Sequence, residues 1–339
     1  MTMRKTFLIG IFFLSLLLTQ CRRTEAVKPV RKEMFVLDTV CQFTFYTNDY
    51  ALAEEDGFRE LLKIEEHFDR HNENSELGKI NRNLSQTLSA DMEELLGRAF
   101  YYADLTDGLF NPAIGPLVDL WDVGSENPRI PGDEEIKEAL KLTDWRKIEF
   151  QNNGVPYLPP GLSLDLGGIA KGYAADKIKT VFESHGIKSA IINLGGNVLV
   201  MGTKPDGSLW KIGVQNPQSV RGEYVGILKL EDSAMVTSGN YERFFEQDGI
   251  RYHHIIDART GSPVRNGLAS VTVVASLSTD ADALSTSLYA MGLKEGMKFS
   301  EENDFFEAIF ITDEKEIYMT KGIQDIFTLT DSTFTVSTL

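Results

Sequence analysis

Four short segments of the sequence combine residue types that can bind phosphate, metal ions or protons. In the first, residues 165–173, a strand-like run meets a helix-like run through Gly167 and Gly168. Free amides at the start of a helix favour an anion, and a cation such as Lys171 in the first turn opposes the helix dipole unless something negative lies between them. The segment is neither a GxGxxG fingerprint nor a Walker A loop. It predicts an anion site, and an ordinary turn with an exposed lysine explains it equally well.

The second segment has the residues of a metal site. Asp282 and Thr286 are four positions apart in a helix-like run, so they share one face of the helix. A carboxylate and a hydroxyl suit a hard cation such as Mg²⁺, which would help an acidic protein to bind a pyrophosphate. The competing interpretation is that Asp280 caps the helix while Asp282 and Thr286 face water.

The third and fourth segments are less specific. Residues 193–197 form a strand-like run that ends in two glycines and Asn197, which allows either a close ligand approach or a tight bend. His253 and His254 follow each other in a strand-like run, so they point to opposite faces and cannot chelate one metal ion. One of them can still act as a general acid or base, although a surface histidine on a hairpin is the commoner explanation.

The elements that must position these residues are read from apolar periodicity and caps. Helices are expected at residues 52–68, with Phe58, Leu61, Leu62 and Phe68 on one face, from a cap at Ser89 to a stop at Gly108, at 169–185, and at 280–291 as the last helix. Strands are expected at residues 36–46, 163–166, 189–194, 198–201, 211–214, 225–230, 252–256, 270–275, 307–311 and 316–320. Helices and strands mixed without strict alternation predict a single α+β domain.

Composition limits the classes of function. The chain has 339 residues, of which 42% are hydrophobic, and this is enough to bury a core and to exclude disorder. Its formal charge of -16 disfavours binding to a phosphate backbone, so we expect no nucleic-acid partner.

The N-terminus predicts export. Arg4 and Lys5 precede an apolar run at residues 7–18, which is too short to span a bilayer and matches a secretory signal. Leu-Thr-Gln-Cys at residues 18–21 stands where a bacterial lipoprotein is cleaved, although the glutamine is unusual there. We therefore expect a signal peptide at residues 1–20 and a lipidated, palmitate-bearing Cys21. A plain signal peptide with an incidental cysteine is the alternative.

Residues 21–33 are rich in Arg and Lys and predict a tether from the lipid to a domain at 34–339. The protein is then expected on the bacterial inner membrane, anchored by lipid and facing the periplasm. Cys41 would be the one remaining cysteine, and its alternating context favours a small strand residue over a nucleophile.

Taken together, these motifs resemble the ApbE family of flavin transferases, lipoprotein or membrane-tethered enzymes that attach FMN from FAD to a target protein. Each motif is weak alone, but they occur in the family's order over most of the mature chain. The matching pieces are residues 37–39, 74–77 with Asn81, 108–112, 115–118 with Trp121, 165–173, 193–197, 210–217, 238–243, 252–263 and 280–286.

The resemblance implies a T-fold-like α+β domain and a set of site residues. It implies that the Asp282 and Thr286 side chains and the Gly168 carbonyl hold Mg²⁺, and that His254 is the catalytic acid or base. The residues that it implies at the FAD site are Leu37, His71, Asn111, Lys171, Asn197 and His254.

Departures from the family's pattern fall in the presumed flavin-contact segments. Leu37-Asp38-Thr39 stands for Met-Gly-Thr, Phe110-Asn111-Pro112 for Phe-Asp-Pro, Asp257-Ala258 for Asp-Pro, and His71 for an aromatic residue. Flavin binding is therefore a firmer expectation than the exact reaction.

The implied activity is Mg²⁺-dependent transfer of FMN from FAD to a Thr or Ser hydroxyl of an exported or membrane-bound flavoprotein subunit, with release of AMP. Two alternatives stay open. One is a Mg²⁺-dependent FAD pyrophosphatase that gives FMN and AMP, and the other is a non-catalytic flavin-binding lipoprotein.

Overall fold

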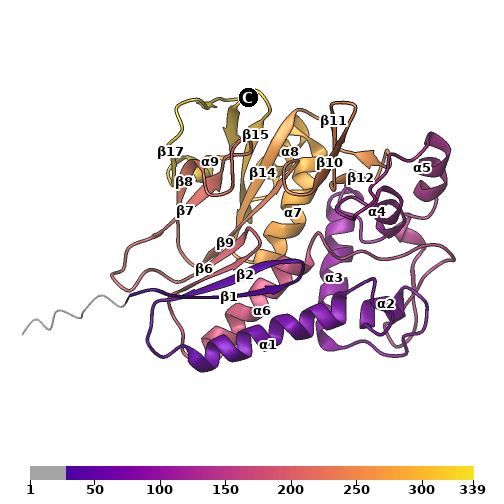
Figure 1. Ribbon diagram of the computed structural model, residues 1–339, viewed down its shortest axis with the longest axis horizontal. Helices are drawn as coiled ribbons and strands as arrows, with labels where there is room; N and C mark the ends of the chain where they lie inside the picture. Colours follow the sequence, from indigo (N-terminus) through magenta and orange to yellow (C-terminus); the bar gives the residue numbers. More distant parts are fainter. Residues whose placement is uncertain (1–27) are drawn as a thin grey trace, which may run out of the picture.

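A nine-stranded sheet forms the centre of the fold in a computed structural model that describes residues 28–339 (Figure 1). Its neighbouring strands are antiparallel except for the pair β16 and β18. In spatial order the strands are β1 (Val30–Val36), β2 (Thr39–Phe45), β5 (Ala190–Leu194), β6 (Asn197–Met201), β9 (Ser233–Gly239), β14 (Leu268–Ala275), β15 (Phe306–Thr312), β16 (Glu316–Met319) and β18 (Thr335–Val336).

Four helices cover one face of this sheet, and a small sheet covers the other (Figure 1). The helices are α1 (Ala51–Phe68), α6 (Ala170–Ser184), α7 (Ser278–Met291) and α8 (Leu293–Glu302). The small sheet has the order β17 (Phe327–Leu329), β8 (Tyr224–Leu230), β7 (Trp210–Gln215), and α9 (Lys321–Gln324) lies beside it. Alternation along β6 shows the division, because Leu199 packs in the helix-side core while Val198 and Val200 pack in the other.

The remaining helices and short strands lie mainly together, at the right of Figure 1. They are α2 (Glu76–Ile80), α3 (Ala90–Leu105), α4 (Gly115–Trp121), α5 (Asp133–Leu140), η1 (Trp145–Lys147), β3 (Glu149–Phe150), β4 (Pro156–Tyr157), β10 (Phe244–Gln247), β11 (Ile250–His253), β12 (Ile256–Asp257) and β13 (Ser262–Pro263). Trp121 of α4 donates from its indole to the Gly261 carbonyl over 2.7 Å, which fixes this region to the β12–β13 hairpin.

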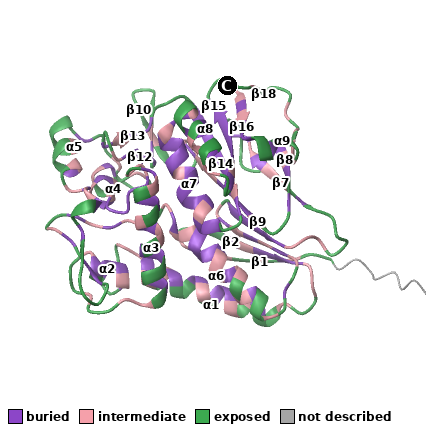
Figure 2. Cartoon of the chain, turned by 180° about the vertical axis from the view of Figure 1, so that it is seen from behind, coloured by how far each residue is buried: buried purple, intermediate pink, exposed green. Residues whose placement is uncertain are grey.

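The expected α+β class and the main helices are confirmed, but the expectation that residues 280–291 form the last helix is wrong, because α8 and α9 follow α7 in the chain. Ser89 caps α3 by accepting from the Met92 amide at 3.2 Å, and α6 ends just before Gly186, which adopts a φ of 73°. Buried residues lie on the inner faces of the helices (Figure 2).

Several expected boundaries are wrong. Residues 163–166 form no strand, because the Asn81 side chain bonds both the amide and the carbonyl of Leu164 in place of a neighbouring strand. The expected strand at residues 252–256 is broken at His254. On α1, Leu62 is 48% exposed and Ile64 takes its expected place in the core.

The domain also begins earlier than expected. Strand β1 starts at Val30, so the last part of the expected tether pairs with β2 in the sheet. The expected signal peptide and Cys21 lie outside the described residues. Within residues 28–339, no helix combines the length and the hydrophobicity that crossing a bilayer requires.

Candidate active site

The N-terminal ends of α6 and α7 meet and cap each other. Neither helix has a side-chain cap from its own N-cap residue. Asp282 of α7 accepts from the Gly172 amide of α6 at 2.8 Å, and Asp176 of α6 accepts from the amides of Ser278 and Thr279 at 2.9 and 2.8 Å. These bonds satisfy amides that have no partner within their own helix. The two candidate segments, 165–173 and 280–286, are thereby brought together.

Gly172 permits this close approach. A Cβ atom on Gly172 would lie 2.3 Å from the Ser278 carbonyl oxygen and 2.7 Å from the Asp282 Cβ. Any side chain there would push the two helices apart, so the glycine is required by the helix contact.

Asp282 is a buried carboxylate that lacks a close cation. Its side chain is 4% exposed, which excludes the interpretation that it faces water. Burial raises its pKa, while the charge of Lys171, the bond from the Gly172 amide and the nearby Asn197 side chain act in the opposite direction. Among residues 28–339, no Lys, Arg or His nitrogen lies within 4 Å of this carboxylate. A buried carboxylate in this state is stabilised by a bound cation.

Thr286 and Gly168 lie on the same side as Asp282. A Cβ on Gly168 would be 3.8 Å from Thr286 Oγ1, so the turn before α6 contacts the α7 face that carries both predicted ligands. Ser238 at the end of β9 is hydrogen bonded to Thr286 Oγ1 at 3.2 Å and to Ser285 Oγ at 2.9 Å. Ser238 therefore restricts the rotation of the Thr286 hydroxyl.

This donor set fits Mg²⁺. Within the described part of the chain, no three His, Cys, Asp or Glu side chains converge on one point, so a metal here would depend on neutral oxygens beside the Asp282 carboxylate. Mg²⁺ is bound in proteins through one or two carboxylates while it keeps several waters and phosphate oxygens. Asn197 is also buried beside Asp282, and its Nδ2 has no hydrogen-bond partner among residues 28–339.

Lys171 acts electrostatically on both Asp282 and His254. Its charge lowers the pKa of both side chains, and no carboxylate lies within 4 Å of its Nζ in the described chain. The ammonium group is therefore free to bind an anion at the start of α6, as the sequence predicts. The competing prediction of an isolated surface lysine does not explain its influence on two site residues.

The two histidines differ in exposure, as the alternation of side chains along a strand predicts. His253 is buried, with Nε2 bonded to the Val264 carbonyl at 2.8 Å and Nδ1 accepting from the Ile255 amide at 3.3 Å, so its role is structural. His254 is solvent-exposed, and the protein packed beside the ring, with the charges of His253 and Lys171, lowers its pKa. Its Nδ1 lies 3.3 Å from the Arg243 carbonyl oxygen. A neutral ring that donates from Nδ1 leaves Nε2 as an acceptor.

Leu37 lies on the tight turn between β1 and β2. Leu37 and Asp38 have φ values of 57° and 54°, and the Leu37 amide donates to Glu65 Oε1 at 2.7 Å. The adjoining Thr39 fills the space beside Gly195, where a Cβ would lie 2.2 Å from Thr39 Oγ1. The segments 37–39 and 193–197 therefore meet at one edge of the site.

Asn111 and His71 each follow a residue that contacts the segment before α6, which includes Asp165 and Gly168. Their own side chains have other surroundings. Phe110 lies 3.4 Å from a Cβ on Gly168, but the Asn111 amide is engaged by the Thr143 carbonyl and the Ala113 amide. His71 is exposed beside Arg70, whose guanidinium pairs with Asp119 at 2.8 Å and lies 3.5 Å from Asp165. Within residues 28–339, neither side chain is hydrogen bonded to Lys171 or Asp282.

Cys41 is a buried strand residue, as expected. Burial raises its pKa to about 12, and its thiol points to the Val36 carbonyl at 3.4 Å. It is unsuited to act as a nucleophile.

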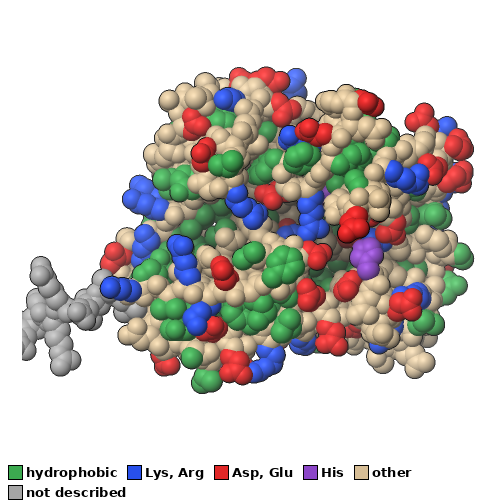
Figure 3. Space-filling model, in the orientation of Figure 1, with side chains coloured by type: hydrophobic (Ala, Val, Ile, Leu, Met, Phe, Trp, Pro, Cys, Tyr) green, Lys and Arg blue, Asp and Glu red, His purple; other side chains and the backbone are tan. Residues whose placement is uncertain are grey.

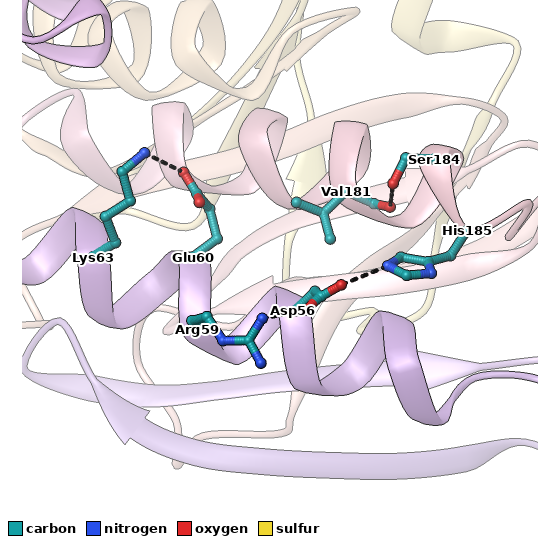
Figure 4. Close-up of a pocket in the computed structure, with 7 residues that line it drawn as sticks. All are labelled: Asp56, Arg59, Glu60, Lys63, Val181, Ser184 and His185. Atoms are coloured by element: carbon teal, nitrogen blue, oxygen red, sulfur yellow. Dashed lines mark hydrogen bonds and ion pairs between the residues drawn. The ribbon is translucent and has the colours of Figure 1, made fainter.

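The surface supports this placement of the site. Figure 3 shows a hollow near the centre of one face, at the position of α7 in Figure 1, with basic side chains inside it and acidic ones around it. A separate groove between α1 and α6 is lined by Asp56, Arg59, Glu60, Lys63, Val181, Ser184 and His185 (Figure 4). Its charges are paired with each other, as in His185 to Asp56 at 2.8 Å, and His185 lies at the opposite end of α6 from Lys171. This groove contains none of the predicted site residues.

Two supporting residues were missed from the sequence. Asp176 and Ser238 contact the elements that carry the predicted ligands, but neither was expected to do so. Asp176 lies four residues after Gly172, and this spacing is the one signal that placed both on the same helix face.

Comparison with known proteins gives one consistent family. The sequence model of the ApbE family matches residues 37–310. The chain is 32% identical to a protein of Treponema pallidum named FAD:protein FMN transferase, over 93% of each chain, and 34% identical to a Klebsiella pneumoniae protein of the same name, over 86% of this chain and 92% of that one.

Solved structures agree. The fold matches the crystal structure of the ApbE protein from Thermotoga maritima with a TM-score of 0.82 at 32% identity, and the flavin transferase ApbE from Vibrio cholerae with a TM-score of 0.79 at 28% identity. Each match covers 88% of this chain and 99% of the other.

Proposed function

The chain belongs to the ApbE family, and from this premise we propose that it is an FAD:protein FMN transferase that depends on Mg²⁺ and releases AMP. The observation that carries the proposal is the meeting of α6 and α7. One helix start offers free amides and Lys171, and the other offers a buried carboxylate and a hydroxyl on one face.

Each of these groups has a task in binding FAD. Lys171 and the α6 amides bind the pyrophosphate, since both favour negative charge at a helix start. Asp282, Thr286 and the Gly168 carbonyl are the residues that would hold Mg²⁺. When bound, this ion neutralises the pyrophosphate and polarises the phosphorus nearer the flavin.

His254 is the residue proposed to move the proton. Its neutral Nε2 accepts the proton of a Thr or Ser hydroxyl on the acceptor. The hydroxyl oxygen then forms a bond to the phosphorus nearer the flavin, and the bond from that phosphorus to the bridging oxygen breaks, so that AMP leaves. FMN remains on the acceptor as a phosphoester. Lys171 stabilises the charge that develops on the phosphate oxygens.

A second activity follows from the exposure of His254. Because water reaches the ring as readily as an acceptor hydroxyl does, the same arrangement would support hydrolysis of FAD to FMN and AMP. We propose transfer as the main activity, since the relatives at 32% and 34% identity are named as transferases.

The cellular setting is also a proposal. A lipid on Cys21 would hold the enzyme on the periplasmic side of the inner membrane, where it would meet exported or membrane-bound flavoprotein subunits. The charged and apolar runs before Cys21 support this setting.

One assay tests the reaction. Purified protein is mixed with FAD, Mg²⁺ and a periplasmic flavoprotein subunit, and the products are separated by denaturing electrophoresis and chromatography. A flavin-fluorescent acceptor band together with AMP supports transfer. AMP and free FMN without a labelled band for any acceptor support the pyrophosphatase instead. Absence of AMP contradicts both and leaves a flavin-binding protein.

A further inference from the structure

We propose that Asp176 is a positioning residue for the metal and phosphate site, because it fixes the start of α7 against the start of α6. The proposal rests on the proposed function and names a residue that does not itself contact substrate or metal. Asp176 lies on α6, beyond the turn that carries Gly168 and Lys171.

Three bonds tie this carboxylate to α7. Oδ1 accepts from the Ser278 amide at 2.9 Å, and Oδ2 accepts from the Thr279 amide at 2.8 Å and from the Thr279 hydroxyl at 2.6 Å. Leu277, the residue before α7, offers no side-chain cap. Asp176 is therefore the group that satisfies the first two amides of α7 in the structure.

The contact is reciprocal. Gly172 and Asp176 are four residues apart on one face of α6, and Ser278 and Asp282 are four apart on the facing side of α7. In one direction, a backbone amide of α6 donates to the Asp282 carboxylate of α7. In the other direction, two amides and one hydroxyl of α7 donate to the Asp176 carboxylate of α6. Because the two sets lie one turn apart on each helix, they fix both the separation of the helices and their relative translation.

This register sets the distance between the two halves of the site. Gly168 and Lys171 belong to one helix start, and Asp282 and Thr286 belong to the other. Loss of the Asp176 cap leaves a single bond, from Gly172 to Asp282, which does not prevent the helices from sliding or tilting. The predicted metal ligands would then lose their geometry although none of them has changed.

The neighbouring Asp280 provides a matched control. It lies in the same first turn of α7, but its carboxylate pairs with Arg98 of α3 at 3.3 Å and acts on Asp176 through its charge alone, which raises the pKa of Asp176. Removing its charge changes the electrostatics of the helix start and leaves the contact between α6 and α7 in place.

The test measures metal affinity as well as turnover. The mature protein and its Asp176→Asn and Asp280→Asn variants are titrated with Mn²⁺, and free Mn²⁺ is followed by electron paramagnetic resonance. Asp176→Asn is expected to raise the Kd about tenfold or more, the range seen when groups that orient ligands are removed. Asp280→Asn should stay within about twofold of the wild type, because its carboxylate bonds Arg98 of α3 and none of the amides of α6 or α7 that hold the two helices together.

Turnover gives a second readout. With FAD as substrate, Asp176→Asn should raise the Mg²⁺ concentration needed for half-maximal AMP release, and excess Mg²⁺ should restore most of kcat. A residue that served stability alone would lower the melting temperature without changing the metal requirement. Thr279→Val, which removes one of the three donors, should show a smaller rise in Kd, while Thr279→Ser should match the wild type.

The outcomes separate the two proposals. Wild-type Mn²⁺ affinity in Asp176→Asn, or equal losses in Asp176→Asn and Asp280→Asn, overturns the positioning role. If Asp176→Asn does not fold, an unchanged Kd in Thr279→Val overturns it. A wild type that binds Mn²⁺ more tightly than Asp176→Asn but releases no AMP supports the positioning role and contradicts the proposed reaction.

Discussion

The Gly172 amide donates to Asp282 Oδ2 over 2.8 Å, although the two residues are 110 positions apart in the sequence. Asp282 therefore combines two tasks, because it caps α6 and is the carboxylate of the proposed metal site. Substitutions that remove one task and keep the other distinguish them.

Asp282→Asn is expected to abolish the reaction with little effect on the fold. The asparagine oxygen can still accept from Gly172, but the charge that attracts the metal is lost, so AMP release should fall on the order of 100-fold or more. Asp282→Ala should lose the same activity and also leave the Gly172 amide unpaired, which costs about 1–3 kcal/mol of unfolding free energy. Chromatography of AMP and urea unfolding measure the two effects. An Asp282→Asn enzyme with normal activity contradicts the metal assignment.

The sequence predicts the proposed ligands better than the residues that support them. The spacing of Asp282 and Thr286 places them on one helix face whatever the surrounding fold is, and the structure confirms this placement. The bond from Asp176 to Ser278 cannot be read from the sequence, because it depends on how two distant helices pack. The burial of Asp282, which excludes a surface carboxylate, also depends on that packing.

In the fold, too, the sequence predicts local features better than long-range contacts. Ser89 is recognised as a cap because its effect is local. Strand β9 (Ser233–Gly239) was missed, since its small residues alternate weakly even though it pairs with both β6 and β14. At Leu164 the sequence favours a strand, but a long-range bond from Asn81 replaces the strand partner.

Lys171 is expected to contribute to FAD binding through its charge. Lys171→Met should raise the Kd for FAD about tenfold, or ~1.4 kcal/mol, while Lys171→Arg should retain most of the affinity. Isothermal titration of FAD without divalent metal measures this contribution separately from the metal. Equal affinity in Lys171→Met and the wild type contradicts an anion site at the start of α6. Lys179→Met, at the other end of α6 and paired with Asp232 at 2.9 Å, serves as the control.

Asp91 is expected to stabilise the fold in a pH-dependent way. Burial alone would raise its pKa, but bonds from Lys177 at 2.8 Å, Lys63 at 2.6 Å and the Tyr173 hydroxyl at 2.9 Å hold the pKa well below its usual value. Because the folded pKa is depressed, this stabilisation is complete above the unfolded pKa of about 3.9 and is lost as the pH falls below it.

Asp91→Asn should therefore lower the unfolding free energy by about 2 kcal/mol at pH 7, and the difference from the wild type should shrink below pH ~4. Urea unfolding between pH 2.5 and 7 measures it. Asp104→Asn, an exposed carboxylate on the same helix, should have little effect at any pH. A difference that is constant with pH argues against the ion pairs as its cause.

Cys21 is expected to carry the lipid anchor. Radiolabelled palmitate should enter the full-length protein expressed in bacteria and not its Cys21→Ala variant, and the wild type should sediment with membranes. Multiple acyl chains on one cysteine would hold the protein more firmly than a single chain. Equal labelling of both proteins contradicts the lipoprotein assignment and favours a plain signal peptide.

His254 is expected to act as the general base, with an unusual pH dependence. His254→Ala should slow FMN transfer by roughly 10²–10⁴-fold. His185→Ala, at the far end of α6, should leave the rate unchanged.

A base works when it is neutral, so activity is lost as the pH falls through its folded pKa. Desolvation by the surrounding protein, with His253 and Lys171, lowers that pKa, so the fall in kcat/KM should begin at a lower pH than an ordinary histidine would give. An ordinary histidine would begin to lose activity near pH 6.5. Because Lys171 contributes to the shift, Lys171→Met should move the acid limb of the profile to higher pH. A wild-type rate that falls tenfold per pH unit below 6.5, or a His254→Ala enzyme that transfers FMN normally, contradicts the assignment.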